Sequence, residues 1–117
     1  MINVLAVAAG GAIGSVLRFG IQKMLNLSFP AGTLVVNIIG CFVAGWLWAK
    51  YLNGLNAPMY LFLMTGFCGG FTTFSAFSVE SLQMLIAGRW LLFSTYIIIS
   101  VAGGILAAFL GYKIFNA

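Results

Sequence analysis

Residues 66–78 read Gly-Phe-Cys-Gly-Gly-Phe-Thr-Thr-Phe-Ser-Ala-Phe-Ser and lie inside a long apolar run. In hydrocarbon no water bonds to backbone N–H and C=O groups, so a spanning segment is normally an unbroken helix. The three glycines and two adjacent threonines of this stretch weaken a helix. Broken backbone at membrane depth is tolerated only where protein or a polar cavity surrounds it. The stretch therefore predicts a helix break that forms part of the working site.

The composition excludes a soluble domain. Hydrophobic residues make up 63% of the 117 residues and charged residues 5%, with no histidine, whereas soluble domains carry about 25% charged residues. The five basic residues stand singly at the ends of apolar runs, so we expect membrane lipid and no nucleic acid as a partner. Acid–base catalysis needs a positioned proton carrier. With no histidine and one acidic residue, the sequence predicts a protein that is not an enzyme.

Four segments are long and apolar enough to cross a membrane, which takes about 20 residues. They are residues 3–25, 32–51, 59–87 and 90–115, and the third contains the predicted break. No linker or soluble domain remains, so we expect residues 1–117 to form a single four-helix transmembrane domain. The first segment lacks a basic start and is interpreted as a retained span. The predicted class is an all-α, multi-pass membrane protein.

The distribution of basic residues does not choose an orientation. One face collects Arg18, Lys23 and Arg89, and the other collects Lys50 and Lys113. Because an excess of Lys and Arg marks the cytoplasmic side, this near balance leaves two readings open. Either all copies insert in one orientation, or copies insert both ways and pair antiparallel. Four helices enclose little space, so we expect an oligomer in both cases.

Polar residues within the spans have a cost and usually have a role. Asn37 follows Thr33 by four residues, on one helical face. Its amide has two readings, an interhelical hydrogen bond or a donor that lines a path. Tyr96 and Ser100 are also four residues apart. Their hydroxyls either guide an ion or bond to their own helix.

Phe74 and Phe77 project from one helical face among hydroxyl residues such as Ser75. Phenylalanine rings have a positive edge. The pair is read either as ordinary core aromatics or as ring edges that solvate an anion, with Ser75 beside them. Arg18 and Glu80 are the charges set furthest into their spans. An anion path near Glu80 requires this acid to be paired or to face elsewhere.

Taken together, these motifs resemble the Fluc/CrcB fluoride channels. The resemblance covers all four spans in order, and Ala76 stands where a small hydroxyl residue is usual. We expect this departure to leave the ring pair intact. The motifs are residues 10–14 with Arg18, Gly32 and Thr33 with Asn37 and Gly40, and residues 66–78 with Glu80.

The resemblance implies an antiparallel, dual-topology homodimer with two fluoride pathways. It also implies a structural sodium ion at the dimer centre, held by the main-chain oxygens of Gly69 and Thr72. Arg18 and Glu80 match positions with a structural or vestibular role. The anion pathway that it implies consists of the ring pair Phe74 and Phe77, the donor Asn37, and the hydroxyl track Tyr96 and Ser100.

The leading functional prediction is a passive fluoride-selective channel that exports toxic cytoplasmic fluoride and so gives fluoride resistance. Fluoride is small and strongly hydrated, so a pore must replace its water and still release it. The alternative is a small dual-topology, proton-coupled multidrug exporter. Such exporters need an acid in the first span, and this chain has none there. A non-transporting assembly subunit is a third reading, although it would not need polar residues at mid-span.

Overall fold

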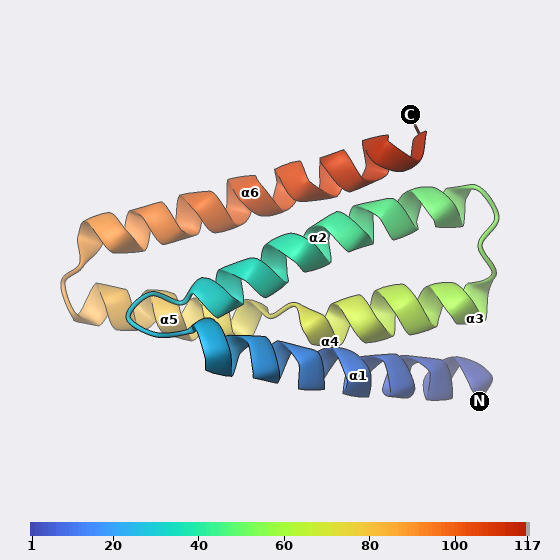
Figure 1. Ribbon diagram of the computed structural model, residues 1–117, viewed down its shortest axis with the longest axis horizontal. Helices are drawn as coiled ribbons and strands as arrows, with labels where there is room; N and C mark the ends of the chain where they lie inside the picture. The colour runs from blue at the N-terminus through green and yellow to red at the C-terminus, as the bar shows by residue number, and fades with distance from the viewer. Residues whose placement is uncertain (117) are drawn as a thin grey trace.

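The computed structural model describes residues 1–116 as an all-helical chain with four long apolar helices, which confirms the predicted multi-pass class (Figure 1). The apolar spans begin and end within two residues of the predicted ranges. The third crossing consists of four consecutive pieces. In chain order, the elements are α1 (Ile2–Leu25), α2 (Ala31–Leu52), α3 (Ala57–Tyr60), η1 (Leu61–Cys68), α4 (Gly69–Phe71), α5 (Phe74–Ile86) and α6 (Trp90–Asn116).

Glycines allow the helices to approach at backbone distance. Helices α2 and α6 lie side by side, and α1 lies along η1 and α4 (Figure 1). A Cβ atom at Gly45 would overlap the backbone carbonyl of Ala108, and one at Gly111 would overlap that of Phe42. Close approach increases van der Waals contact, which is a main attraction between helices in lipid. The two helix pairs are therefore tightly fitted units.

The third crossing starts with an unusual wide turn. Leu61–Cys68 forms a π-helix, η1, in which hydrogen bonds run from each residue to the fifth along the chain. This piece presses against α1, and a Cβ atom at Gly66 would lie 2.8 Å from the carbonyl oxygen of Val7. Nothing in the sequence analysis predicted a π-helix. Its position immediately before the glycine–threonine stretch places irregular backbone on both sides of α4.

The predicted break in the third crossing is present at two residues. Helix α4 ends at Phe71 and α5 begins at Phe74. Between them, Thr72 (φ −90°, ψ 160°) and Thr73 (φ −149°, ψ 124°) adopt extended conformations. β-branched residues favour such backbone. The break gives the span free backbone groups at its middle, and the surrounding helices must satisfy them.

The two ends of the bundle differ in chemistry. At the end where α2 finishes, the Lys50 ammonium lies 4.8 Å from the centroid of the Trp46 ring. Tyr51 stacks there between Trp48 and Tyr60, at centroid distances of 6.1 and 4.2 Å. Such aromatic and basic groups are typical of membrane interfaces. The opposite end carries the α1–α2 and α5–α6 turns (Figure 1).

Candidate functional site

The side chain of Asn37 clamps the break. Its Nδ2 donates to the carbonyl oxygen of Thr73 at 3.0 Å, and its Oδ1 accepts from the Thr73 N–H at 2.7 Å. Asn37 is on α2, so these bonds join α2 to the third crossing. Of the two readings of its amide, the structure contains the interhelical hydrogen bond. One N–H of Nδ2 is left over from this pairing, since a primary amide has two.

Hydroxyl groups also stabilise the two sides of the break. Thr72 Oγ1 donates to the carbonyl oxygen of Cys68 at 2.9 Å, where α4 ends. Thr73 is the N-cap of α5, and its Oγ1 accepts from the Ala76 N–H at 3.1 Å. Ser75 Oγ lies 3.2 Å from Thr73 Oγ1. An N-cap of this kind stabilises a helix by about 1 kcal/mol, so the start of α5 is capped at the break.

The backbone carbonyls at the break are only partly used. Gly70 O accepts from Arg18 Nε at 2.9 Å, and Cys68 O accepts from both the N–H and the hydroxyl of Thr72. Among residues 1–116, no hydrogen bond ends on the carbonyl oxygens of Gly69 or Thr72, the two groups that the family resemblance assigns to sodium. These oxygens are thus available as ligands.

A pocket of about 220 Å³ opens beside the break, and we call it the mid-span pocket. It brings together predicted residues from α2, the break, α5 and α6. The Ser100 hydroxyl is buried and has no hydrogen-bond partner among residues 1–116, so it does not bond to its own helix there. Tyr96 and Ser75 are not among the lining residues. The lining consists of Asn37, Cys41, Thr72, Thr73, Phe74, Phe77, Ser100 and Val101.

Three aromatic rings follow one another beside this pocket. The centroids of Phe74 and Phe77 are 5.8 Å apart with ring planes at 47°, and those of Phe77 and Tyr96 are 5.1 Å apart at 49°. Phe74 is 78% exposed in the single chain, whereas Tyr96 is completely buried. Tilted rings present edges as well as faces. The edge of Phe74 is therefore open to whatever lies beside the chain.

In the part of the chain that the structure describes, the Glu80 carboxylate accepts hydrogen bonds from neutral donors only. Its Oε1 accepts from the Tyr96 hydroxyl at 2.8 Å, and its Oε2 accepts from Thr33 Oγ1 at 2.8 Å and Asn26 Nδ2 at 3.1 Å. Thr33 and Tyr96 have no exposed surface. Because a hydroxyl has one hydrogen to donate, each of these two hydroxyls donates its only hydrogen to the carboxylate. The acid on the third crossing thus ties α5 to α1, α2 and α6.

Arg18 and Glu80 are connected by a relay and not by direct contact. Arg18 Nη1 donates to Gln22 Oε1 at 3.1 Å, Gln22 Nε2 donates to Thr33 Oγ1 at 3.0 Å, and Thr33 donates to Glu80. Gln22 and Asn26 were not among the residues predicted from the sequence. The signal was present, since Arg18, Gln22 and Asn26 recur every four residues and share one face of the first span.

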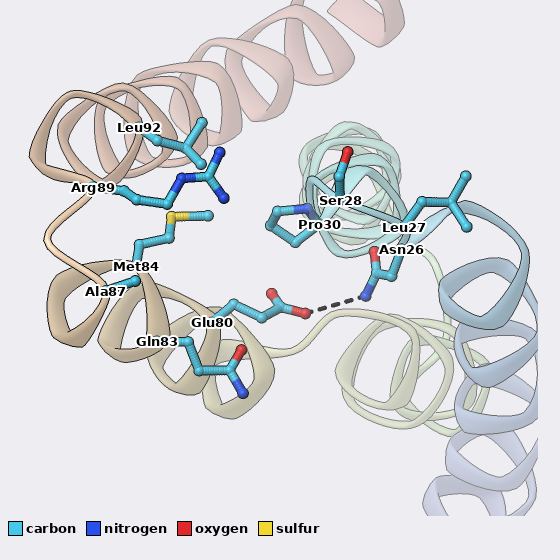
Figure 2. A pocket seen from close by; sticks show the side chains of 10 residues that line it. All are labelled: Asn26, Leu27, Ser28, Pro30, Glu80, Gln83, Met84, Ala87, Arg89 and Leu92. Atoms are coloured by element: carbon cyan, nitrogen blue, oxygen red, sulfur yellow. Dashed lines mark hydrogen bonds between the residues drawn. The ribbon is translucent and has the colours of Figure 1, made fainter.

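A second pocket, of about 250 Å³, lies where the α1–α2 turn faces the α5–α6 turn (Figure 2). We call it the end pocket. Glu80 and Gln83 approach it from α5, Asn26 and Ser28 from the α1–α2 turn, and Arg89 from the α5–α6 turn (Figure 2). The sequence analysis assigned Arg89 no role beyond its place at a span end. The residues predicted from the sequence thus line a pocket beside the break, and Glu80 lines another at an end of the bundle.

Comparison with known proteins identifies the family. The family model of the CrcB-like protein, Camphor Resistance (CrcB), matches residues 5–112. A relative from Leptospira interrogans serogroup Icterohaemorrhagiae serovar copenhageni is 47% identical over 115 residues, covering 93% of this chain and 91% of the relative. One from Azobacteroides pseudotrichonymphae is 44% identical, covering 94% and 93%, and one from Rhizobium etli is 43% identical, covering 100% and 98%.

Each of these three relatives is named a fluoride-specific ion channel FluC. The family match spans all four apolar helices of the structure. Both findings agree with the resemblance found in the sequence, and with a multi-pass protein of the bacterial cell membrane. This chain is a member of the CrcB-like protein family.

Proposed function

We propose that the protein is a passive fluoride-selective channel that exports toxic cytoplasmic fluoride. The observation that carries the proposal is the mid-span pocket, where Asn37, Phe77 and the unpartnered hydroxyl of Ser100 meet at a helix break. Irregular backbone inside a membrane protein is tolerated where it lines a cavity. We propose fluoride as the ion because the relatives are named fluoride-specific ion channels.

The chemistry of this pocket suits transit of a small anion better than its retention. No charged side chain lines it, so an anion meets hydrogen-bond donors and ring edges without a fixed cation that would trap it. A pore must bind well enough to admit an ion and weakly enough to release it. We assign the donors to the Ser100 hydroxyl and the second N–H of Asn37, and the ring edges to Phe74 and Phe77.

Tyr96 and Ser75 are assigned to the wall of the pathway. The Tyr96 hydroxyl donates to Glu80, so an anion at this hydroxyl would compete with the carboxylate for one hydrogen. The ring of Tyr96 lies against Phe77 and supports the position of that ring. Ser75 reaches the pathway through Thr73, to which its hydroxyl is close. Glu80, whose charge faces only neutral donors, belongs to the same wall and limits how closely an anion approaches it.

We further propose an antiparallel, dual-topology homodimer with two pathways. The basic residues are almost evenly divided between the two faces, which removes the usual bias for one orientation. Phe74 is 78% exposed in the single chain, and a second copy would enclose it. Two copies related by antiparallel pairing give two equivalent pathways.

The same dimer would hold a structural sodium ion at the breaks. The carbonyl oxygens of Gly69 and Thr72 fit this group, because unwound backbone carbonyls are typical ligands of sodium in membrane proteins and these two accept no other hydrogen bond among residues 1–116. The ion would supply positive charge at the dimer centre. We assign Gly69 and Thr72 of each chain to this site, so a second copy would complete the ligand set.

The test is ion release from liposomes that contain the purified protein. Valinomycin is added to potassium-loaded vesicles, and fluoride and chloride release are measured in parallel. We expect fluoride release without chloride release. Proton-dependent uptake of an organic cation would instead support the multidrug exporter, which is not favoured because α1 contains no acidic residue.

A further inference from the structure

We propose that the end pocket is an outer mouth of the anion pathway and that Arg89 collects hydrated anions there. This inference rests on the proposed function and extends it to a site at the end of the bundle. The pocket combines one cationic side chain, Arg89, with the polar groups Asn26, Ser28 and Gln83 (Figure 2). The guanidinium group of arginine has several hydrogen-bond donors and no acceptor atom, so it binds anions.

One wall separates the end pocket from the mid-span pocket. Glu80 lines the end pocket and accepts a hydrogen bond from Tyr96. The ring of Tyr96 is 5.1 Å from that of Phe77, and Phe77 lines the mid-span pocket. The two pockets are therefore in series, with Phe77, Tyr96 and Glu80 between them. An ion that leaves the mid-span pocket past Phe77 then reaches the end pocket.

The charge of Glu80 explains why the mouth needs a cation. Within residues 1–116 the carboxylate is bonded only to neutral donors, and no base in this range forms an ion pair with it. A bare negative charge beside the pocket repels fluoride. Arg89 extends its guanidinium into the same pocket (Figure 2). It offsets the repulsion there and raises the local anion concentration, an effect that salt weakens.

The backbone fixes Arg89 at this place. After α5, the Arg89 N–H donates to Met84 O at 2.9 Å and the Gly88 N–H donates to Leu85 O at 3.1 Å. This pair of bonds, with Gly88 at φ 74°, forms a Schellman motif. Arg89 therefore leaves α5 in a defined direction. Glu80 is on α5, and the Schellman motif fixes the backbone of Arg89 relative to the end of that helix.

The size of the pocket suits an ion that still carries water. Its volume is about 250 Å³, and one water occupies about 30 Å³. An anion together with several waters fits, so the mouth concentrates hydrated anions without stripping them. The mid-span pocket has a similar volume, about 220 Å³, so dehydration would take place at the wall between the two pockets, where Phe77, Tyr96 and Glu80 contact one another.

The experiment measures fluoride conductance in planar bilayers of neutral lipid as a function of fluoride concentration at low ionic strength. Arg89→Gln removes the charge, and Lys23→Gln removes the same charge from a residue that does not line the end pocket. We expect Arg89→Gln to lower conductance about two- to fivefold at low fluoride and not at high salt. Lys23→Gln should conduct like the wild type, and Arg89→Lys, which keeps the charge, should conduct better than Arg89→Gln at low fluoride.

A rescue variant tests position as well as charge. Gln83 lines the same pocket from α5, so Gln83→Lys in the Arg89→Gln background should restore conductance at low fluoride. The proposed role of Arg89 would be wrong if Arg89→Gln and Lys23→Gln had equal conductance. It would also be wrong if high salt did not remove the loss of conductance in Arg89→Gln. An effect seen only with anionic lipid would assign Arg89 to a lipid phosphate and overturn it too. If the wild type carries no fluoride current, the proposed channel function is wrong. This result differs from those that contradict only the role of Arg89.

Discussion

Asn37 and Thr73 form a closed pair in which one side-chain amide satisfies both the N–H and the C=O of one extended residue. This is the pairing that a neighbouring strand would provide. Here a single side chain on α2 supplies it inside a helical bundle. An amide is suited to the task because it combines a donor and an acceptor in one plane. The helix break is therefore stable only while α2 lies beside it.

Replacing Asn37 by Asp tests this clamp. A carboxylate can accept from the Thr73 N–H, but it has no donor for the Thr73 carbonyl, which would face a second oxygen. We expect a loss of about 1–3 kcal/mol in the free energy of unfolding, measured by thermal unfolding in detergent. Asn53→Asp is the matched control, since the Asn53 amide donates to Ala49 O at a turn. Equal stability of both variants would contradict the clamp.

The close contact of α2 and α6 predicts sensitivity at Gly45. A Cβ atom there would overlap the Ala108 carbonyl, so Gly45→Ala should push the helices apart and destabilise the protein by about 1–3 kcal/mol. Gly20→Ala is the control, because a Cβ atom at Gly20 meets nothing within 4 Å. Because alanine has a higher helix propensity than glycine, Gly20→Ala should leave the stability of the protein unchanged or raise it. The comparison is made by thermal unfolding, and a tolerated Gly45→Ala would show that the helices are less tightly fitted.

Tyr96 and Glu80 are expected to be energetically coupled. Tyr96→Phe keeps the ring beside Phe77 but removes the hydroxyl that donates to Glu80 at 2.8 Å. Glu80→Gln removes the charge that this hydroxyl satisfies. Each single change should destabilise the fold, and the double change should cost less than their sum by about 0.5–3 kcal/mol. Additive losses in a double-mutant cycle would mean that the hydrogen bond contributes little.

Sodium is expected to stabilise the assembled protein. If the carbonyl oxygens of Gly69 and Thr72 bind the ion in the folded dimer only, stability should rise with the logarithm of sodium concentration above the dissociation constant. The melting temperature of the purified protein is measured in sodium salts and in N-methylglucamine salts of equal ionic strength. If the melting temperature depended on salt concentration in the same way in both series, the proposed sodium site would be wrong.

Much of the architecture is readable from the sequence, because it depends on composition and local propensity. The apolar runs indicate four spans, and the glycines and threonines of residues 66–78 indicate the break that the structure has at Thr72 and Thr73. The resemblance to the Fluc/CrcB family is confirmed by the family model.

The partners of the polar groups are not readable in this way. Whether Asn37 lines a path or clamps a backbone depends on how α2 is placed against the third crossing. The three donors to Glu80 come from α6, α2 and the end of α1, so no single helix predicts them. The π-helix η1 depends on tertiary contact with α1, and residue propensities carry little information about it.

Fluoride release from liposomes with wild-type protein and with Phe77→Ile tests the central claim most directly. Phe77 lines the mid-span pocket and stands between Phe74 and Tyr96, and isoleucine fills a similar space without ring edges. Gel filtration verifies that the variant assembles like the wild type. The account predicts rapid fluoride release without chloride release for the wild type, and none for the variant. Undiminished fluoride release by an assembled Phe77→Ile protein, or equal release of chloride by the wild type, would contradict it.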